Sequence, residues 1–560
     1  MSQDSESPYP SKILPFKVES LPFSEIPGQS KLFIEYQKDS QELAKYYPSK
    51  VSSHTQIARR IPEVLANYKT DRNALCDALE DLNRACGAGE KTLENINLLR
   101  DKECVAVVSG QQAGLLTGPL YTIYKALSAV QLSECLRGRG VKAVPVFWIA
   151  SEDHDFEEVS KAFVIGSKND LIELENEPEN YRENLSVGYV KLDHSIKQTI
   201  DNLFENLPRT EFTEELRNLI EESWQPGFDY GEAFGRLLIS LLGKYGLILL
   251  FPLDERLKKL AAPIYVESVK KSQEIVSALQ KRSRELEENG FHAQVLVSDD
   301  YFPLFWQAED NTRHALKQTA AGTYRVGDLR KEFSLDELAE IAAQEPQRFS
   351  PGVALRAVVQ DYLLPTVCYF GGGAEVAYFA QSSEVYRILQ RPVTPILHRQ
   401  SFTIVEPKQA KILDKFNLEI KDLFDGIEYI TPRIVEDFLN PEMKKLFAEV
   451  EENINTQLNR LDRSLAEIEP TLADNLANKR RKIIYHIANL RKKYHFAEMR
   501  KDKILTRQIE MIFNTLVPNK HLQERTLNVT WLINRYGLNL IDWIYQAIDL
   551  DDKEHRVIYL

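Results

Sequence analysis

Short apolar runs that end in polar clusters alternate with helical patterns in the first third of the chain. One run, rich in β-branched residues, covers residues 104–108 and meets a glycine-rich turn at residues 110–118. A helical pattern follows, with Thr117 as a candidate cap and Pro119 near its first turn. A second apolar run covers residues 144–150 and stops at a polar cluster. Strand, glycine turn, helix and strand in this order predict a βαβ unit.

The same pattern returns between residues 346 and 404. An apolar run at Thr366–Phe370 precedes three consecutive glycines, a helical pattern over Ala374–Leu389 and a further apolar run that ends at His398. A buried strand is also expected at Gly246–Phe251. The fold class predicted from these patterns is α/β, with a Rossmann-type parallel-sheet core that two insertions interrupt.

The patterns divide the chain into several segments. The first insertion reads as three short strands followed by two polar helices. The second reads as one long helix over Glu255–Asn289, four short strand-like runs of which residues 292–297 are the first, and a helix that opens with a capping box at Ser334 and Glu337. Residues 1–30 carry five prolines and predict an extended arm. The expected boundaries are 1–159 for an N-terminal helical region and the first half of the core, 160–230 for the first connecting insertion, 231–255 for more of the core, 256–345 for the second connecting insertion, 346–404 for the second half of the core, 405–517 for a helical coiled-coil domain, and 518–560 for a C-terminal segment that packs back on the core.

The apolar residues from Phe447 to Leu476 recur every three or four positions, as in a coiled coil. A single straight helix over Glu442–Val517 would be about 110 Å long, so we expect an antiparallel hairpin of two long helices. Pro470 either opens the second helix or kinks the first. Because this row of apolar residues is longer than one hairpin partner needs, we also expect a homodimer through the coiled coil. Residues 479–503 hold ten Lys and Arg against two acidic residues, a pattern typical of a solvated helix face or of a phosphate contact.

Composition narrows the classes of function. The 560 residues carry a net charge of −13, which argues against broad nucleic-acid binding. No apolar run reaches the roughly 18 residues that a membrane span needs, and the polar, acidic N-terminus has no signal-peptide pattern. Five scattered cysteines without a CxxC motif predict a reducing, cytoplasmic setting and no zinc site. We therefore expect no metal, no membrane and no nucleic acid among the partners.

The glycine-rich turn is the first candidate for binding chemistry. Gly110, Gln111, Gln112, Thr117 and Gly118 precede a helix N-terminus, where backbone N–H groups and the helix dipole suit phosphate or carboxylate. The spacing matches neither the dinucleotide fingerprint nor the Walker loop. The alternative is a tight turn whose glycines only permit close packing.

A polar cluster directly after the second strand of the βαβ unit is more specific. Three carboxylates and an imidazole, Glu152, Asp153, His154 and Asp155, follow a buried run, and packing does not require them there. They could bind a substrate amine, orient a metal or supply a base. Between two carboxylates, His154 is expected to keep its proton. The alternative is a set of helix-capping acids beside a hydrogen-bonded histidine.

Further polar residues flank the strand at Thr366–Phe370. Three glycines at a helix start suggest another anion site, whereas an ordinary strand-to-helix turn needs only one. We expect one cavity in which Gln111, Gln112, Asp153, His154 and Asp155 face a far wall at the strand ends. The expected residues of this second region are Gln360, Asp361, Gly372, Glu375 and Tyr378.

Five motifs, taken together and in this order, resemble one known family. They are GQQAGLLTGPLYTIYKA, FWIASEDHDFEEV, LRAVVQDYLLPTV, GGGAEVAYFAQ and LQERTLN, and they are similar to those of the cysteine-adding enzymes of bacillithiol synthesis, BshC. The sequence departs from the family at Gly373 and Phe379, where Pro and Trp are more frequent, and at Phe251, where an acid is common. The resemblance implies a Rossmann-type core similar to class I aminoacyl-tRNA synthetases and a coiled coil that mediates homodimerisation.

The resemblance also implies an activity. The expected reaction joins L-cysteine to the amine of glucosaminyl malate through an amide bond, the last step of bacillithiol synthesis. A free carboxylate needs activation, most simply by an ATP/ADP-type nucleotide, and the amine must lose a proton to Asp153, His154 or Asp155. Tyr121 and Tyr124 stand where the synthetases would carry histidines.

The nucleotide has two candidate places. One is the turn at Gly110–Gly118. The other is the point where the chain leaves the core for the coiled coil, at Leu397, His398, Arg399 and Asn528, although Arg399 and Arg525 could instead pair with Glu406 and Glu524. Two other functions remain open at this point: a tRNA-linked aminoacyl or nucleotidyl transferase, and a non-catalytic dimeric scaffold.

Overall fold

The computed structural model describes residues 16–51, 53–327 and 329–560. Two compact units are present, one made of the chain up to Thr403 with Glu524–Ile558, and the other of Ile404–Gln523 with Tyr559–Leu560. The first half of the arm predicted for residues 1–30 lies outside the described residues, and its described half contains β1 (Lys17–Leu21).

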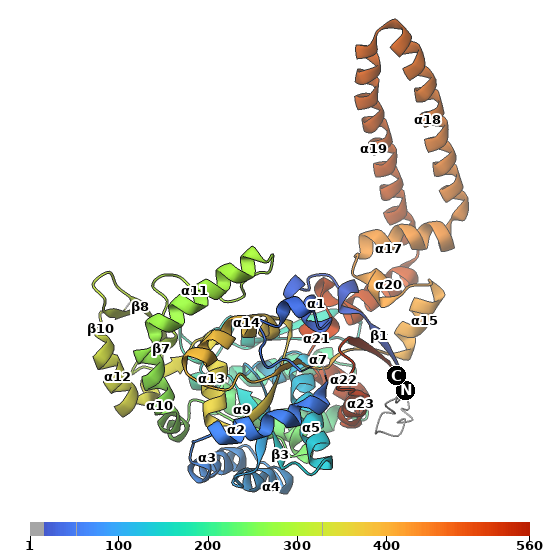
Figure 1. The fold of residues 1–560 in the computed structure, drawn as a ribbon. Helices are drawn as coiled ribbons and strands as arrows, with labels where there is room; N and C mark the ends of the chain where they lie inside the picture. The colour runs from blue at the N-terminus through green and yellow to red at the C-terminus, as the bar shows by residue number, and fades with distance from the viewer. Residues whose placement is uncertain (1–15, 52, 328) are drawn as a thin grey trace, which may run out of the picture. The chain divides into compact units, whose positions relative to one another are not determined.

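A five-stranded parallel sheet forms the centre of the first unit, as the sequence predicted (Figure 1). Its order is β13-β12-β2-β3-β6, and neighbouring strands run parallel throughout. Nearly every residue of these strands is buried, which fits the continuous apolar runs of the sequence. The strands are β2 (Val105–Gln111), β3 (Ala143–Ile149), β6 (Ile248–Leu250), β12 (Thr366–Gly371) and β13 (Ile396–His398).

The order in which the chain visits these strands creates a switch point. From β2 the chain passes through α5 (Tyr121–Gly138) to β3, on one side of β2. From β12, which lies on the other side of β2, it passes through α14 (Gly373–Ile388) to β13, farther from β2 on that other side. The loops after β2 and β12 therefore lead away in opposite directions from two adjacent strand ends. Ligands of open α/β sheets bind outside the carboxyl ends of the strands at such a point.

Gly110, near the end of β2, is required by close packing against β3. It lies opposite Trp148 in the parallel register, and a Cβ atom on Gly110 would come within 2.6 Å of the Trp148 carbonyl oxygen. Only glycine lets the two strands approach in this way. The packing alternative considered for the glycine-rich turn thus holds at this position.

The start of α5 differs from the prediction. Its N-cap residue is Leu120 without a side-chain cap, and Thr117 lies in a preceding turn (Leu115–Thr117) at φ 78°. Thr117 therefore does not cap the helix, because the chain is still turning there.

The first insertion has two strands instead of three. β4 (Lys161–Ile165) and β5 (Leu171–Glu175) pair antiparallel, while the third predicted strand forms a short 3-10 turn at Val187–Tyr189. The two predicted helices are α7 (Ser195–Asn206) and α8 (Thr213–Ser223). α9 (Tyr230–Leu242) then leads back into the core at β6.

The second insertion contains two helices where one was predicted. α10 (Glu255–Lys270) and α11 (Ser272–Glu288) are separated at Lys271, whose φ of −100° and ψ of 12° leave the helical region. An antiparallel sheet of order β10-β9-β8-β7-β11 follows, and the run at residues 292–297 is not a strand. The sheet consists of β7 (Leu304–Gln307), β8 (Arg313–Gln318), β9 (Tyr324–Val326), β10 (Glu332–Phe333) and β11 (Phe349–Pro351).

Helices from the second insertion and from both ends of the chain complete the first unit. The predicted capping box at Ser334 and Glu337 is present at α12 (Leu335–Gln344), and α13 (Val353–Leu363) leads into β12. In the C-terminal segment, the Asn534 side chain bonds to Thr213 and to the Pro208 carbonyl, so this segment packs on the first insertion. The remaining helices are α1 (Lys31–Gln37), α2 (Ile61–Asn67), α3 (Arg72–Ala85), α4 (Glu90–Leu99), α21 (Gln523–Thr526), α22 (Thr530–Tyr536) and α23 (Asn539–Ala547).

The second unit contains the predicted helical hairpin (Figure 1). α18 (Pro441–Ile468) and α19 (Pro470–Lys501) run antiparallel: Arg480 bonds to Asn455, and Arg491 pairs with Glu451. Pro470 opens the second helix, since Glu469 before it has an extended backbone. Other helices of the unit include α15 (Pro407–Lys415), α17 (Ile427–Ile434) and α20 (Lys503–Leu516). Across the described ranges of the chain, no helix is long and apolar enough to cross a membrane.

Candidate functional site

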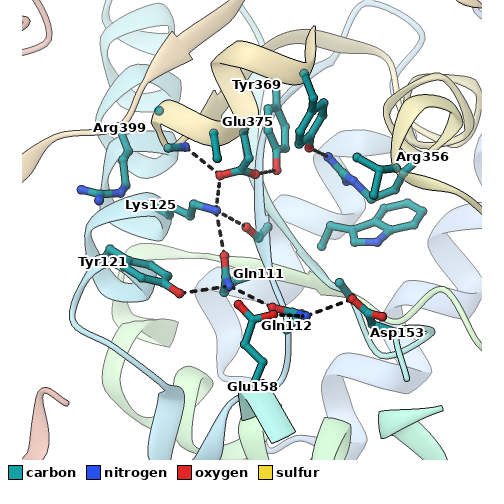
Figure 2. A pocket seen from close by; sticks show the side chains of 18 of the residues that line it. Gln111, Gln112, Tyr121, Lys125, Asp153, Glu158, Arg356, Tyr369, Glu375 and Arg399 are labelled. Atoms are coloured by element: carbon teal, nitrogen blue, oxygen red, sulfur yellow. Dashed lines mark hydrogen bonds and ion pairs between the residues drawn. The ribbon is translucent and has the colours of Figure 1, made fainter. Parts of the chain in front are cut away.

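A pocket of about 330 Å³ lies at the carboxyl ends of β2, β3 and β12 (Figure 2). It occupies the switch point of the sheet. The sequence-predicted residues on its wall come from all three strand ends, and they are Gly110, Gln111, Gln112, Tyr121, Asp153, Gly372, Glu375, Tyr378 and Arg399. The wall also contains residues that the sequence did not single out, among them Lys125, Trp148, Glu158, Arg356 and Tyr369, and it contains Arg525, which the sequence offered only as an ion-pair partner.

Lys125, on the first turns of α5, forms the centre of the polar wall. Its ammonium group pairs with Glu375 and donates hydrogen bonds to the Gly110 carbonyl at 3.0 Å and to Gln111 Oε1 at 2.8 Å. These contacts use all three of its N–H groups. Burial lowers the pKa of Lys125, and the neighbouring Glu375 opposes that shift. Lys125 therefore orients the wall and has no donor left for a ligand.

Glu375 occupies the N-terminus of α14. Its carboxylate accepts the Gly372 N–H at 2.7 Å, in a capping arrangement, and the Tyr369 hydroxyl at 2.6 Å. Burial alone would raise the pKa of Glu375, but Lys125 and these two donors outweigh it and lower the pKa. A negative charge of the protein itself thus fills the anion site that the three glycines predicted.

The two glutamines after β2 link Lys125 to the acidic side of the pocket. Gln111 Nε2 lies 3.3 Å from the Tyr121 hydroxyl, and Gln112 Nε2 donates to Asp153 Oδ2 at 2.9 Å and to Glu158 Oε2 at 3.0 Å. Figure 2 shows this chain of contacts running from Glu375 to Asp153. The pocket therefore presents two carboxylates, on Asp153 and Glu158, that share one amide group.

Arg356, on α13, supplies a cation on the opposite side of the pocket. Its guanidinium lies 5.0 Å from the ring centre of Tyr369 and 5.9 Å from that of Trp148. It donates to Gln360 Oε1 at 3.0 Å and to the Tyr378 hydroxyl at 3.4 Å. Burial would lower the pKa of Arg356, but the tyrosines beside it raise the pKa above its ordinary value. Its remaining N–H groups are suited to a carboxylate or phosphate.

A second cationic region of the wall contains Arg399 and Arg525. Arg399 is 3% exposed and donates to Glu524 Oε1 at 2.7 Å. The Arg399–Glu524 pair is one that the sequence offered as the alternative to nucleotide binding. Arg525 is exposed and has no ion pair with any other described residue. The wall thus carries one fixed and one solvent-facing guanidinium.

Three residues of the cluster after β3 do not line the pocket. Glu152 is buried and ion-paired with Lys258, and Asp155 accepts the Glu158 N–H at the start of α6 (Phe156–Val159). His154 Nδ1 lies 3.2 Å from a guanidinium nitrogen of Arg313. Burial and then Arg313 lower the pKa of His154, against the opposing effect of Asp153 and Asp155. The expectation that His154 keeps its proton was therefore wrong: the sequence could not reveal a cation from a distant insertion.

The residues predicted for the far wall are placed differently from one another. Gln360 is buried and joins Arg356 to Asp361, so it supports the pocket without lining it. Asp361 accepts the Tyr386 hydroxyl and lines a separate small cavity; burial raises its pKa.

Thr117 and Gly118, which were predicted with the glycine-rich turn, lie in the turn outside the pocket wall. Tyr121 is on the wall, and burial raises its pKa to about 12.

The four residues predicted to bind a nucleotide belong to the first unit. The His398 ring packs against Phe23 and Phe33, and burial lowers its pKa well below the ordinary value. Asn528 is fully buried, and its amide donates to the carbonyls of Leu116 and Gly118 at 2.5 and 2.6 Å. Leu397 lies in β13. Of the four residues, Arg399 is the one on the pocket wall.

Some of the missed residues carried a signal in the sequence. Lys125 and Arg356 each stand alone inside an apolar helical stretch that follows or precedes a core strand. A charge buried on such a helix needs a partner or a function. Within the part of the chain that the structure describes, no group of three or more His, Cys, Asp or Glu side chains is arranged to hold a metal ion.

Comparison with known proteins gives the same family along the whole described chain. The model of the "Bacillithiol biosynthesis BshC, N-terminal Rossmann-like domain" matches residues 16–400, and that of the "C-terminal coiled-coil domain" matches residues 402–560. Chains named "Putative cysteine ligase BshC" from Koribacter versatilis and Salinibacter ruber are each 35% identical; the alignments cover 96% and 94% of this chain, and 99% and 96% of theirs. A solved structure titled as a putative arginyl-tRNA synthetase, from Campylobacter jejuni, gives a TM-score of 0.21 at 10% identity over 84% of this chain and 98% of its own. The Rossmann-like core and the coiled-coil region predicted from the sequence are thus confirmed, and the chain belongs to the BshC family of bacillithiol biosynthesis.

Proposed function

We propose that this protein is a cysteine ligase that joins L-cysteine to the amine of glucosaminyl malate through an amide bond. One observation carries the proposal: relatives named as cysteine ligases align over nearly their full length, through both the core and the coiled coil. The five cysteines are free thiols, in keeping with our proposal that the enzyme acts in the cytoplasm.

The pocket at the switch point has the size and polarity for these substrates. Its volume of about 330 Å³ falls at the lower end of small-molecule sites. Both substrates carry carboxylates, and Arg356, held between Trp148 and Tyr369, is positioned to bind one of them. Arg525, exposed at the wall, would meet a second. The Trp148 indole N–H, buried and without a partner in the described structure, is a further donor.

Proton removal from the amine is assigned to the acidic side of the pocket. The attacking amine must be neutral, so its ammonium form first gives a proton to a carboxylate within hydrogen-bond reach. Asp153 is the candidate that the sequence predicted, and Glu158 shares its Gln112 donor. We assign the role to Asp153, because Glu158 is exposed whereas Asp153 is half-buried beside Ala150 on the pocket wall.

Activation of the cysteine carboxylate requires a leaving group, and we propose an ATP-type nucleotide for this step. A cysteine carboxylate oxygen attacks the α- or γ-phosphorus of the nucleotide and displaces pyrophosphate or ADP, and attack by the amine on the acyl carbon then expels that oxygen with AMP or phosphate. The nucleotide site is proposed at Arg399 with Leu397 and His398, and Asn528 holds the adjoining turn.

Calorimetric titration of ADP into the Arg399→Ala and His154→Ala variants tests the proposed nucleotide site. Weakened binding in Arg399→Ala alone supports it, and weakening in His154→Ala alone contradicts it.

We further propose that the protein forms a homodimer through the coiled coil. Large apolar side chains on the hairpin remain exposed in the single chain, including Ile468 at 76% and Leu490 at 57%. Burying such residues against a second copy is the ordinary use of a coiled-coil surface. The basic stretch on α19 is proposed to be a solvated face, so an electrophoretic shift with tRNA should be absent.

The direct test is ligation in solution. The purified protein is incubated with cysteine, glucosaminyl malate and ATP, and product, AMP and ADP are measured by mass spectrometry. We expect the amide product together with one of the two nucleotides, and no product when cysteine is replaced by serine. Absence of product with each nucleoside triphosphate tried would reject the proposed function.

A further inference from the structure

Arg313, the first residue of β8 in the second insertion, reaches the loop after β3 although it does not line the pocket. It is 8% exposed, and its guanidinium stacks over the Phe305 ring with 3.9 Å to the ring centre. A buried guanidinium is costly unless hydrogen bonds and charges compensate it. The contacts of Arg313 therefore indicate what it is there to hold.

The contacts of Arg313 lead in two directions. On one side, Nη1 lies 3.2 Å from His154 Nδ1 and 3.4 Å from Asp153 Oδ1. On the other side, Nε donates to Ser350 Oγ and Nη2 to the Pro351 carbonyl, each at 2.9 Å. Pro351 ends β11, and α13, which carries Arg356, begins two residues later. One side chain thus connects the acidic wall of the pocket to the start of the helix that bears its cation.

The contact with His154 fixes the position of a proton. A guanidinium only donates hydrogen bonds, so His154 Nδ1 must be the acceptor, and the neutral ring carries its proton on Nε2. The charged or titratable groups that face the ring are Asp153 and Asp155 from its own loop, and Arg313 and His314 from β8. Burial and Arg313 together lower the pKa of His154 despite the two carboxylates. His154 in this state can donate a hydrogen bond from Nε2 but is a poor general base.

We propose that Arg313 is a positioning residue that fixes Asp153 as the proton acceptor and keeps His154 neutral with its proton on Nε2. The second insertion would thereby decide which residue of the cluster after β3 takes the proton. The part that concerns proton transfer rests on the proposed ligase function, whereas the part that concerns the state of His154 does not.

The state of His154 is measured without substrate. Hydrogen–deuterium exchange at the imidazole C2 carbon, followed by mass spectrometry of peptides, reports the pKa of individual histidines. Arg313→Met removes the charge and keeps an apolar contact with Phe305, Arg313→Lys keeps the charge without the fork of donors, and Arg325→Gln removes an exposed cation from the neighbouring strand. We expect a His154 pKa below the ordinary value in the wild type and in Arg325→Gln, and a higher pKa in Arg313→Met. A wild-type pKa at or above the ordinary value, or an unchanged pKa in Arg313→Met, would overturn the proposal.

The effect on catalysis is measured by the pH dependence of kcat/KM. Misplacement of a reacting group by about 1 Å costs up to about 100-fold in rate, so both Arg313 variants should lose activity while Arg325→Gln retains it. Because Arg313 pairs with the Asp153 carboxylate and contacts His154, loss of the cation should also change the shape of the pH profile in Arg313→Met, which a merely structural defect would leave unchanged. If Arg313→Met does not fold, Arg313→Lys still tests the proposal, since loss of the fork should lower kcat/KM with the charge in place. If the wild type forms no amide, the ligase function fails, and the pKa measurement alone decides the role of Arg313.

Discussion

Gln112 Nε2 lies 2.9 Å from Asp153 Oδ2, so the amide that follows β2 holds the carboxylate that follows β3. The same nitrogen donates to Glu158 at 3.0 Å. Because Gln112 uses both N–H groups on the two acids, the polar wall is oriented before any substrate enters. Preorganised groups of this kind are effective in catalysis since they need not be reordered during the reaction.

Replacement of the proposed proton acceptor should slow the chemical step. Asp153→Asn keeps the size of the side chain and removes its basicity, and general-base catalysis typically contributes about 10²- to 10⁴-fold. We expect kcat to fall within that range, and a cooperative thermal unfolding transition shows that the variant is folded. Glu157→Gln, an exposed neighbour on α6, is the matched control. An unchanged kcat in Asp153→Asn would move the role to Glu158.

Loss of the half-buried guanidinium of Arg356 on α13 should weaken substrate binding. Arg356→Lys keeps a charge but loses the planar fork that binds a carboxylate through two hydrogen bonds. We expect KM for one of the two substrates to rise about 10-fold, as for one or two kcal/mol of lost binding, and Arg387→Lys on the exposed side of α14 to behave as the wild type. Steady-state kinetics with each substrate varied in turn identifies the one that Arg356 binds. If the KM values of Arg356→Lys for both substrates are the same as those of the wild type, the assignment is contradicted.

The Lys125–Glu375 pair should matter more when one partner is removed than when both are. Lys125→Met leaves the partly buried Glu375 carboxylate without its cation, and breaking such a pair costs up to about 3–5 kcal/mol when it is fully buried. The double variant Lys125→Met with Glu375→Gln should recover much of that loss. Thermal unfolding of the two single variants and the double variant gives the coupling free energy. Simple additivity of the effects would show that the pair is not coupled.

Stability should also depend on pH through Glu375. Since its pKa is lowered in the folded state, the carboxylate contributes stability above the unfolded pKa of a glutamate, about 4.3, and this contribution is lost as the pH falls through the folded value. The wild type should therefore lose more stability than Glu375→Gln on acidification below about pH 5. Denaturant unfolding at several pH values measures the difference. Parallel curves for the two proteins would argue that Glu375 is not ionised.

The exposed apolar residues of the hairpin should hold two copies together. Leu461 and Ile468 are exposed by 47% and 76%, whereas Leu458 and Leu465 are only partly exposed on the same helix. Leu461→Glu with Ile468→Glu should therefore give monomers in light scattering without unfolding the hairpin. Asn453→Glu, at an exposed polar position, is the control. A dimer that persists in the double variant would place the interface elsewhere.

The sequence predicted those parts of the structure that depend on local pattern. Buried strands such as Val105–Gln111 and Thr366–Gly371 appeared as apolar runs, and the capping box at Ser334 as a four-residue motif. A break such as that at Lys271 was missed because it rests on two backbone angles within an otherwise continuous helical pattern. Helix ends and short strands depend on packing that no short window contains.

The candidate site was predicted in part for the same reason. Gln111, Gln112, Asp153 and Glu375 stand at strand ends or within four residues of them, and the topology of a parallel sheet brings such positions together. The protonation of His154 was mistaken because the sequence shows its two acidic neighbours and not Arg313, which is 159 positions away. Long-range contacts of this kind decide the charge state of a site, and no local pattern encodes them.

The central claim, that the protein joins a cysteine carboxylate to an amine with nucleotide activation, is tested most directly by isotope transfer. Cysteine labelled with ¹⁸O in both carboxylate oxygens is incubated with glucosaminyl malate, ATP and the wild-type protein. We predict that the amide product keeps one ¹⁸O, that the other appears in AMP or in inorganic phosphate, and that Asp153→Asn slows formation of both. Amide product whose second ¹⁸O is found in water, or an absence of amide product, would contradict the account.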